Sequence, residues 1–180
     1  MKTLNLLFSG FGGQGILFSG KFMAYKGLME DKNVSWLPSY GPEMRGGTAS
    51  CSVIISDELV GSPIVSNPDV LVAMNLPSFD KYEGSVVKGG YAFVDSTLIE
   101  RKTVRDDIKA IYIPATKLAN ENGIPTLANM IIVGCILNTL GIYSEESVKA
   151  ALGKVISAKH ADMLEYNLKA LQIGAEFKGE

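Results

Sequence analysis

Residues that bind metal ions and clusters are scarce in this sequence. Its 180 residues include two cysteines, Cys51 and Cys135, and one histidine, His160. The cysteines lie far apart and outside any Cys-x-x-Cys pattern, whereas iron–sulfur clusters and structural zinc sites need sets of such ligands. We therefore expect no metal site in this chain. Both cysteines are predicted to be small buried residues, and His160 to be a surface or helix-start residue.

An excess of charge of one sign and long hydrophobic runs are also lacking. Lys and Arg number 17 against 19 Asp and Glu, which gives a net charge of -2 and no electrostatic case for nucleic-acid binding. The apolar run at 4–8 is too short for the core of a signal peptide. The run at 130–137 is far below the roughly 20 residues that a membrane span needs. The sequence thus predicts a cytoplasmic chain that binds neither nucleic acid nor membrane.

Short apolar runs alternate with helical patterns over the first two thirds of the chain. Strands are predicted at 4–8, 34–38, 51–56, 70–74, 91–95 and 110–114. Helices are predicted at 16–30, 75–82, 115–123, 125–141, 144–157 and 162–177. This order indicates one α/β domain over 1–180: a doubly wound, mainly parallel, Rossmann-like sheet with helices on both faces and a helical C-terminal third. Ligands of such sheets bind at the carboxyl ends of the strands.

The most glycine-rich stretch, "SGFGGQGILFSGK", follows the first predicted strand. Its spacing Gly10-x-Gly12-x-x-Gly15 matches the dinucleotide-binding fingerprint. A NAD site also needs an acidic residue after the second strand, and the region "NVSWLPSYG" has none. Two interpretations remain: the glycines only permit a tight turn, or free N–H groups at the helix start bind a phosphate, a carboxylate or a neighbouring subunit. Gln14 adds an amide able to hydrogen-bond a ligand or an adjacent loop.

A second loop, "SYGPEMRGGTASC", follows the second predicted strand. Arg45 stands between Pro42 and the pair Gly46-Gly47. Its guanidinium is suited to bidentate contacts with a carboxylate or a phosphate. The alternative is a local ion pair with Glu43, which would contribute little to stability.

The combination of "GFGGQG" and "PSYGPEMRGGTASC" resembles the gamma subunit of 2-oxoacid:ferredoxin oxidoreductases. The likeness is greatest to the 2-oxoglutarate and 2-oxoisovalerate branches, and the pyruvate and indolepyruvate enzymes are more distant kin. It extends over the whole chain, through "NPDVLVAMN", "GGYAFVDST", "YIPATKLA" and "NMIIVGCILNTLG".

This resemblance implies an oxidative decarboxylation, in which a 2-oxoacid, coenzyme A and oxidised ferredoxin give acyl-coenzyme A, carbon dioxide and reduced ferredoxin. It favours 2-oxoglutarate as the substrate, with 2-oxoisovalerate or pyruvate as alternatives. Thiamine diphosphate, Mg and iron–sulfur clusters are expected in the other subunits, and coenzyme A as co-substrate. The implied partners are alpha and beta subunits, a delta ferredoxin-like subunit as a further candidate, and ferredoxin itself; a homodimer formed through the complex stays open.

The residues of this chain fit a supporting role in such a complex rather than a catalytic one. The sequence has no Gly-Asp-Gly start of a thiamine diphosphate motif and no cysteine set for a cluster. We therefore place no catalytic residue and no resident cofactor in this chain, and expect it to be inactive alone. By resemblance, the domain packs against the other subunits and helps to hold coenzyme A or to shape access to the thiamine site. The candidate contact residues are Gly10, Gly12, Gly13, Gln14 and Gly15 in the first loop, and Tyr40, Glu43, Arg45, Gly46 and Gly47 in the second. A free-standing, nucleotide-binding Rossmann-like protein is the alternative from another class.

Overall fold

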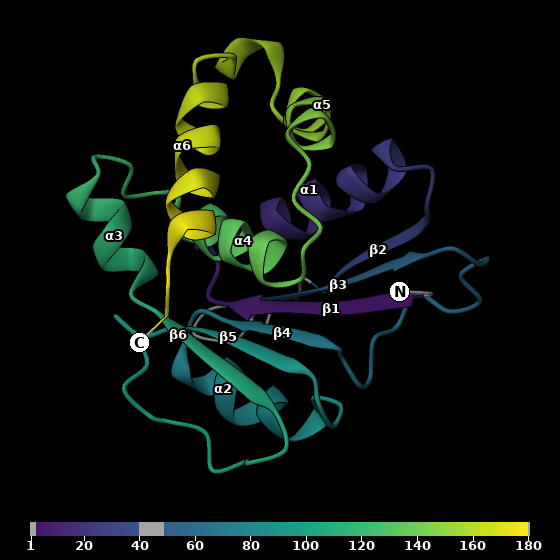
Figure 1. Ribbon diagram of the computed structural model, residues 1–180, viewed down its shortest axis with the longest axis vertical. Helices are drawn as coiled ribbons and strands as arrows, with labels where there is room; N and C mark the ends of the chain where they lie inside the picture. Colours follow the sequence, from purple (N-terminus) through teal and green to yellow (C-terminus); the bar gives the residue numbers. More distant parts are fainter. Residues whose placement is uncertain (1–2, 40–48, 180) are drawn as a thin grey trace.

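The computed structural model describes residues 3–39 and 49–179. Within these residues a six-stranded sheet has the order β2-β3-β1-β4-β5-β6 (Figure 1). Its strands are β1 (Thr3–Gly10), β2 (Asn33–Ser39), β3 (Ala49–Ser56), β4 (Val70–Ala73), β5 (Tyr91–Asp95) and β6 (Lys109–Ile113). Every strand expected from the sequence is confirmed, with bounds shifted by at most two residues.

The sheet is mainly parallel, as predicted. β1, β4, β5 and β6 pair in parallel, whereas β3 runs antiparallel to both of its neighbours, β1 and β2. A parallel pair needs a crossover of about a dozen residues or more. The connection from β2 to β3 spans only 40–48, which explains why this pair is antiparallel.

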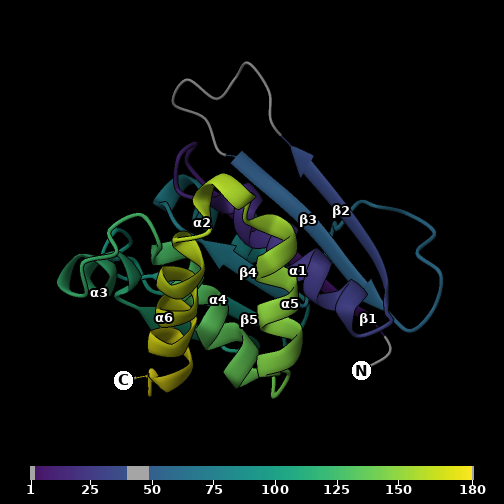
Figure 2. The ribbon, with the colours of Figure 1, turned by 90° about the horizontal axis from the view of Figure 1, so that it is seen from above.

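Helices cover both faces of the sheet. They are α1 (Ile16–Met29), α2 (Leu76–Tyr82), α3 (Ala115–Glu121), α4 (Ala128–Thr139), α5 (Glu145–Val155) and α6 (Met163–Glu176), with short 3-10 turns η2 (Glu83–Ser85) and η3 (Ala158–His160). Figure 1 shows α2 below the sheet and α1 and α4 above it. On the side of these two helices away from the sheet, α5 packs on α1 and α6 packs on α4, so α5 and α6 form an outer layer, which is nearest the viewer in Figure 2.

The helix starts follow from local sequence with one correction. Asn75 Oδ1 accepts from Ser78 N at 2.8 Å to cap α2, and Ser144 Oγ accepts from Ser147 N at 3.4 Å to cap α5. The helix predicted from Pro125 instead begins at Ala128. A turn replaces its expected first residues, because the Leu127 N–H bonds the carbonyl of Ile124 at 3.0 Å.

Alternation along β1 separates two cores. Leu4, Leu6 and Phe8 face α1 and α4, while Leu7 packs with Phe79 of α2 on the opposite face. α4 lies between the sheet and α6, and therefore has no polar face from its start through position 137.

The outer helix α6 approaches α4 at backbone contact. A Cβ atom placed on Gly174 of α6 would overlap the carbonyl oxygen of Ile131, and one placed on Gly134 of α4 would overlap the carbonyl oxygen of Leu171. Glycine is therefore required at both positions for the two helices to pack as they do.

Both cysteines are buried, as predicted. Burial raises the pKa of the Cys51 thiol from 9.0 to about 12 and also raises the pKa of Cys135. The folded state thus favours the protonated thiols, and the contribution of Cys51 to stability is complete below pH 9 and is lost as the pH rises toward 12.

We expect neither thiol to react with an aromatic disulfide reagent at pH 8 in the native protein, because both thiolates are disfavoured and shielded. After unfolding in guanidinium, two thiols per chain should react. Fast modification of the native protein at Cys51, located by peptide mass spectrometry, would contradict this.

Candidate functional site

The first glycine loop joins the carboxyl end of β1 to α1, at the sheet edge where Rossmann-like folds bind ligands. Gly13 and Gly15 have φ values of +90° and +76°, in the left-handed region that favours glycine. The Gln14 N–H donates to the carbonyl of Phe11 at 3.3 Å and closes the turn. The glycines therefore do permit a tight turn.

Gln14 braces this loop against the next strand. Its Oε1 accepts from the Phe11 N–H at 2.6 Å, and its Nε2 donates to the carbonyl of Met74 at 2.8 Å, just beyond β4. The sequence leaves two roles open for this amide, a hydrogen bond to a ligand or one to an adjacent loop. In the structure the amide bonds an adjacent segment, at Met74. Gly10 permits the bracing, because a Cβ atom there would lie 2.6 Å from Gln14 Oε1.

The start of α1 leaves backbone donors available. Within the described part of the chain, the N–H groups of Gly12, Gly13, Gly15, Ile16 and Leu17 have no acceptor. The first turn of α1 carries no acidic residue and no side-chain cap. Free N–H groups and the positive end of the helix dipole favour an anion at this position.

Asn129 of α4, which is not among the candidate residues predicted from the sequence, contacts the first loop. Its Nδ2 donates to the Gly15 carbonyl at 3.1 Å and to Ser19 Oγ at 3.0 Å. A Cβ atom on Gly15 would overlap this amide. One signal was available in the sequence: Asn129 is a lone polar residue in the apolar stretch that begins α4.

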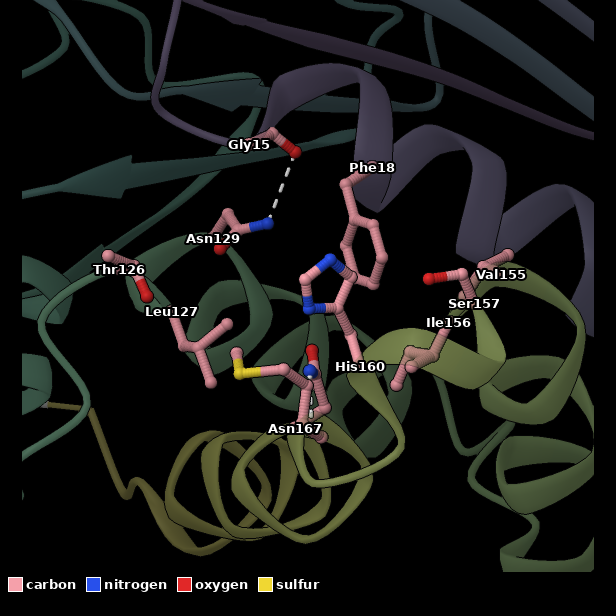
Figure 3. Close-up of a pocket in the computed structure, with 11 residues that line it drawn as sticks. Gly15, Phe18, Thr126, Leu127, Asn129, Val155, Ile156, Ser157, His160 and Asn167 are labelled. Carbon is pink, nitrogen blue, oxygen red and sulfur yellow. Dashed lines mark hydrogen bonds between the residues drawn. The ribbon is translucent and has the colours of Figure 1, made fainter.

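A cavity of about 320 Å³ opens beside Gly15, between the starts of α1 and α4 and the segment that leads into α6. Phe18 and Leu127 contribute apolar walls (Figure 3). His160 also lines it; it is exposed and stands in η3, just before α6, which confirms the expected surface or helix-start position.

A partly buried ion pair holds α5, whose end lines this cavity. Lys26 of α1 is 2% exposed and its Nζ lies 2.5 Å from Glu30 Oε1. Ser147 of α5 donates to the same carboxylate oxygen at 2.8 Å. This network ties α5 to α1 through a buried ammonium group and a carboxylate that is 33% exposed.

The second loop's candidates, Tyr40, Glu43, Arg45, Gly46 and Gly47, lie outside the described residues. The strands that flank this loop are described, and Gly10 at the end of β1 pairs with Ala49 at the start of β3. Both loops therefore depart from the same edge of the sheet.

Within the described residues, 3–39 and 49–179, no helix has both the length and the apolar character to cross a membrane. Nor do three or more His, Cys, Asp or Glu side chains gather there in a way that could hold a metal ion.

Residues 5–177 match the family described as pyruvate ferredoxin/flavodoxin oxidoreductase. The chain belongs to this family. Ketoisovalerate oxidoreductase subunit VorA of Methanothermobacter marburgensis is 40% identical over 98% of this chain and 37% of its own length. The 2-oxoglutarate synthase subunit KorC of Methanocaldococcus jannaschii is 34% identical over 96% of this chain and 92% of its own length. The chain thus spans little more than a third of the ketoisovalerate relative.

Two solved structures have the same fold as this member of the pyruvate ferredoxin/flavodoxin oxidoreductase family. The gamma subunit of a keto/oxoacid ferredoxin oxidoreductase from Geobacter sulfurreducens is 30% identical, with a TM-score of 0.81 and 96% of each chain covered. The 2-oxoglutarate:ferredoxin oxidoreductase from Magnetococcus marinus, with 2-oxoglutarate, coenzyme A and succinyl-CoA bound, is 26% identical, with a TM-score of 0.85, over 97% of this chain and 30% of that one. The resemblance to the gamma subunit is confirmed.

Proposed function

We propose that this chain acts as the gamma subunit of a cytoplasmic, thiamine diphosphate-dependent 2-oxoacid:ferredoxin oxidoreductase complex. The complex converts one 2-oxoacid and coenzyme A into acyl-coenzyme A and carbon dioxide, and passes two electrons to two oxidised ferredoxins. The observation that carries the proposal is the family match over 5–177. The departure of both glycine loops from one sheet edge supports it, because that edge is where such folds bind ligands.

The role of this chain in the complex is to bind and orient. The free N–H groups at the start of α1 suit a phosphate of coenzyme A or a carboxylate of a partner subunit. We assign contacts with ligand or partner to the first-loop and second-loop candidates, with Gln14 acting through its brace to Met74. Thiamine diphosphate, held with Mg by alpha and beta subunits, would supply the electron sink for decarboxylation, and clusters in other subunits would carry the electrons.

Two 2-oxoacids are the candidate substrates. The sequence motifs favour 2-oxoglutarate, and the 34% identity to a 2-oxoglutarate synthase subunit supports it. The 40% identity to a ketoisovalerate oxidoreductase subunit favours the branched-chain acid, which we therefore place first.

The complex itself tests this proposal. When the tagged chain is purified anaerobically from its own cells, alpha and beta subunits should co-purify with it as a brown complex. This complex should reduce viologen in a reaction that depends on coenzyme A. Comparing 2-oxoisovalerate, 2-oxoglutarate, pyruvate and indolepyruvate identifies the substrate. A colourless chain without partners or reduction would contradict the proposal, and calorimetry with NAD(H) and NADP(H) would then test the free-standing alternative.

Replacing Arg45 by alanine in the complex should raise the KM for coenzyme A about 10-fold, because a charge-assisted hydrogen bond contributes about 1.5–3 kcal/mol. The kcat at saturating coenzyme A should stay within about twofold, because binding made equally in ground and transition states affects KM alone. Lys149→Ala, which removes an exposed charge on α5, is the control. If assembly and the KM for coenzyme A were both unchanged, Arg45 would not be a ligand-binding residue.

A further inference from the structure

A second cavity, of about 250 Å³, lies at the end of the sheet where β1 begins (Figure 1). The end of α1, the end of β3 and the segment between α4 and α5 enclose it, and we call it the Lys32 cavity. Leu4 lines it, whereas the first glycine loop follows Gly10 at the other end of β1, roughly 20 Å away along an extended strand. The Lys32 cavity is therefore separate from the sheet edge that carries both glycine loops.

Two cationic and two anionic side chains line the Lys32 cavity. They form two ion pairs, Lys26 with Glu30 and Lys32 with Asp57. The four charges cancel, so a ligand with a net charge of either sign would add a charge without a counter-charge. A ligand that is neutral overall but carries both an ammonium and a carboxylate group matches this wall.

Each pair leaves an atom available to such a ligand. Glu30 Oε1 accepts from Lys26 Nζ at 2.5 Å and from Ser147 Oγ at 2.8 Å, and these two bonds orient the carboxylate. Within the described chain, Glu30 Oε2 accepts no hydrogen bond, and Lys32 Nζ uses one of its three hydrogens, on Asp57. Glu30 and Lys32 are 33% and 38% exposed, so a ligand can reach both.

The two available groups lie within electrostatic reach of each other. The pKa of the Lys32 ammonium is raised above its usual value, chiefly by its hydrogen bond with Asp57 and to a smaller extent by the charge of Glu30. An acceptor for an ammonium group and a donor for a carboxylate thus stand side by side at one cavity. This arrangement suits the two charged groups of one small zwitterion.

The rest of the wall is mostly aliphatic. The apolar lining consists of Leu4, Met23, Ile55 and Ile142, of which the two isoleucines are partly exposed. The other lining residues are Gly27 and Ser56, and the Ser56 hydroxyl is already bonded by Thr3 and by the Glu58 N–H. The volume lies just below the range of about 300–1,000 Å³ that is typical of drug-sized ligands. The ligand is therefore small and has an aliphatic part.

We propose that the Lys32 cavity binds a free aliphatic α-amino acid of the leucine and valine class. Its ammonium group donates to Glu30 Oε2, its carboxylate accepts from Lys32 Nζ, and its side chain packs on Ile55 and Ile142. Because the cavity lies at the opposite end of the sheet from the glycine loops, this ligand is an effector and not a substrate. The inference goes beyond the proposed function and holds for the chain alone.

Four small molecules test the three parts of the proposed ligand separately. L-Leucine carries all three, 4-methylpentanoate lacks the ammonium group, 3-methylbutylamine lacks the carboxylate, and glycine lacks the side chain. Titration of the full chain, followed by calorimetry or ligand-observed NMR, should show leucine binding with a Kd of about 1 mM or tighter. Each of the two leucine analogues should bind about 10-fold more weakly or less, because each loses a charge-assisted hydrogen bond, and glycine should also bind more weakly. No binding of leucine, or equal binding of any of the other three, would overturn the proposal.

A pair of lysine variants locates the site. Lys32→Gln removes the positive charge at the cavity and should weaken leucine binding about 10-fold. Lys149→Gln makes the same change at an exposed lysine of α5 that is also paired with a carboxylate, Glu145, and that does not line this cavity; leucine binding should stay unchanged. Equal effects of both variants would contradict the assignment. If Lys32→Gln does not fold, the comparison of the four ligands on the unaltered chain still decides.

Viologen reduction by the complex is a separate readout. A complex that assembles and reduces viologen, but whose chain binds no leucine, would overturn this inference and leave the proposed function intact. Leucine binding by a chain that co-purifies with no partner would support the inference and contradict the proposed function.

Discussion

Replacing Gly174 by alanine is expected to destabilise the protein by about 3 kcal/mol, the upper part of the range for overpacking a core. The added Cβ would overlap the carbonyl oxygen of Ile131 on α4. A backbone atom cannot rotate away as a side chain can, so the whole of α6 must move. The intrinsic gain in helix propensity, about 1 kcal/mol, would offset only part of the loss. For a chain of this size, the midpoint of thermal unfolding should fall by about 6–12 °C.

Gly153→Ala is the matched control. This glycine is also helical, in α5, but a Cβ atom there meets nothing within 4 Å. The substitution should therefore stabilise the protein by up to about 1 kcal/mol. Chemical denaturation of both variants separates helix propensity from the steric contact. A fall in stability of similar size in both, or none at Gly174, would show that α6 does not pack on α4 through this glycine.

Replacing Gly15 by alanine is expected to destabilise the protein by about 3 kcal/mol, for two reasons that add. A φ of +76° is unfavourable for alanine by about 1–2 kcal/mol. The Cβ would also overlap the Asn129 amide, which is held by the Gly15 carbonyl and Ser19. Urea denaturation monitored by circular dichroism measures the change.

Gly13→Ala isolates the first of these causes. Gly13 also has a positive φ, of +90°, but a Cβ atom there meets nothing within 4 Å. Its expected destabilisation is about 1 kcal/mol.

In an Asn129→Ala background the overlap is gone, so Gly15→Ala should be less destabilising there by about 1 kcal/mol or more. Additive effects of the two substitutions would rule out the contact between Gly15 and Asn129.

The helix contacts and the loop contacts meet at the cavity beside Gly15. Gly134 and Gly174 hold α6 close to α4, and this brings Asn167 to the same space as Asn129. The partly buried Lys26 and Glu30 pair holds α5 on α1 and so positions the end of α5 at that space. Substitutions in the outer helices are therefore expected to alter the cavity without touching the first loop.

Local sequence predicted the elements of this fold well because their signals are local. The six strands are short runs of apolar and β-branched residues between turn signals, and the helix caps at Asn75 and Ser144 are set within three residues of the chain. The start of α4 was misplaced at Pro125. Proline favours the first turn of a helix, but here the turn from Ile124 to Leu127 formed instead.

By itself, the sequence determined the type of each element, the mainly parallel sheet, the first glycine loop and the family of the chain. The tertiary structure alone decided that Gln14 braces Met74, that Asn129 contacts Gly15 and that Asn167 shares a cavity with it. The reason is physical. Hydrophobic periodicity specifies which face of a helix is buried, but it does not specify which other element packs against that face. The partner depends on how closely the backbones of distant segments can approach, and here the glycines in α4 and α6 set that approach.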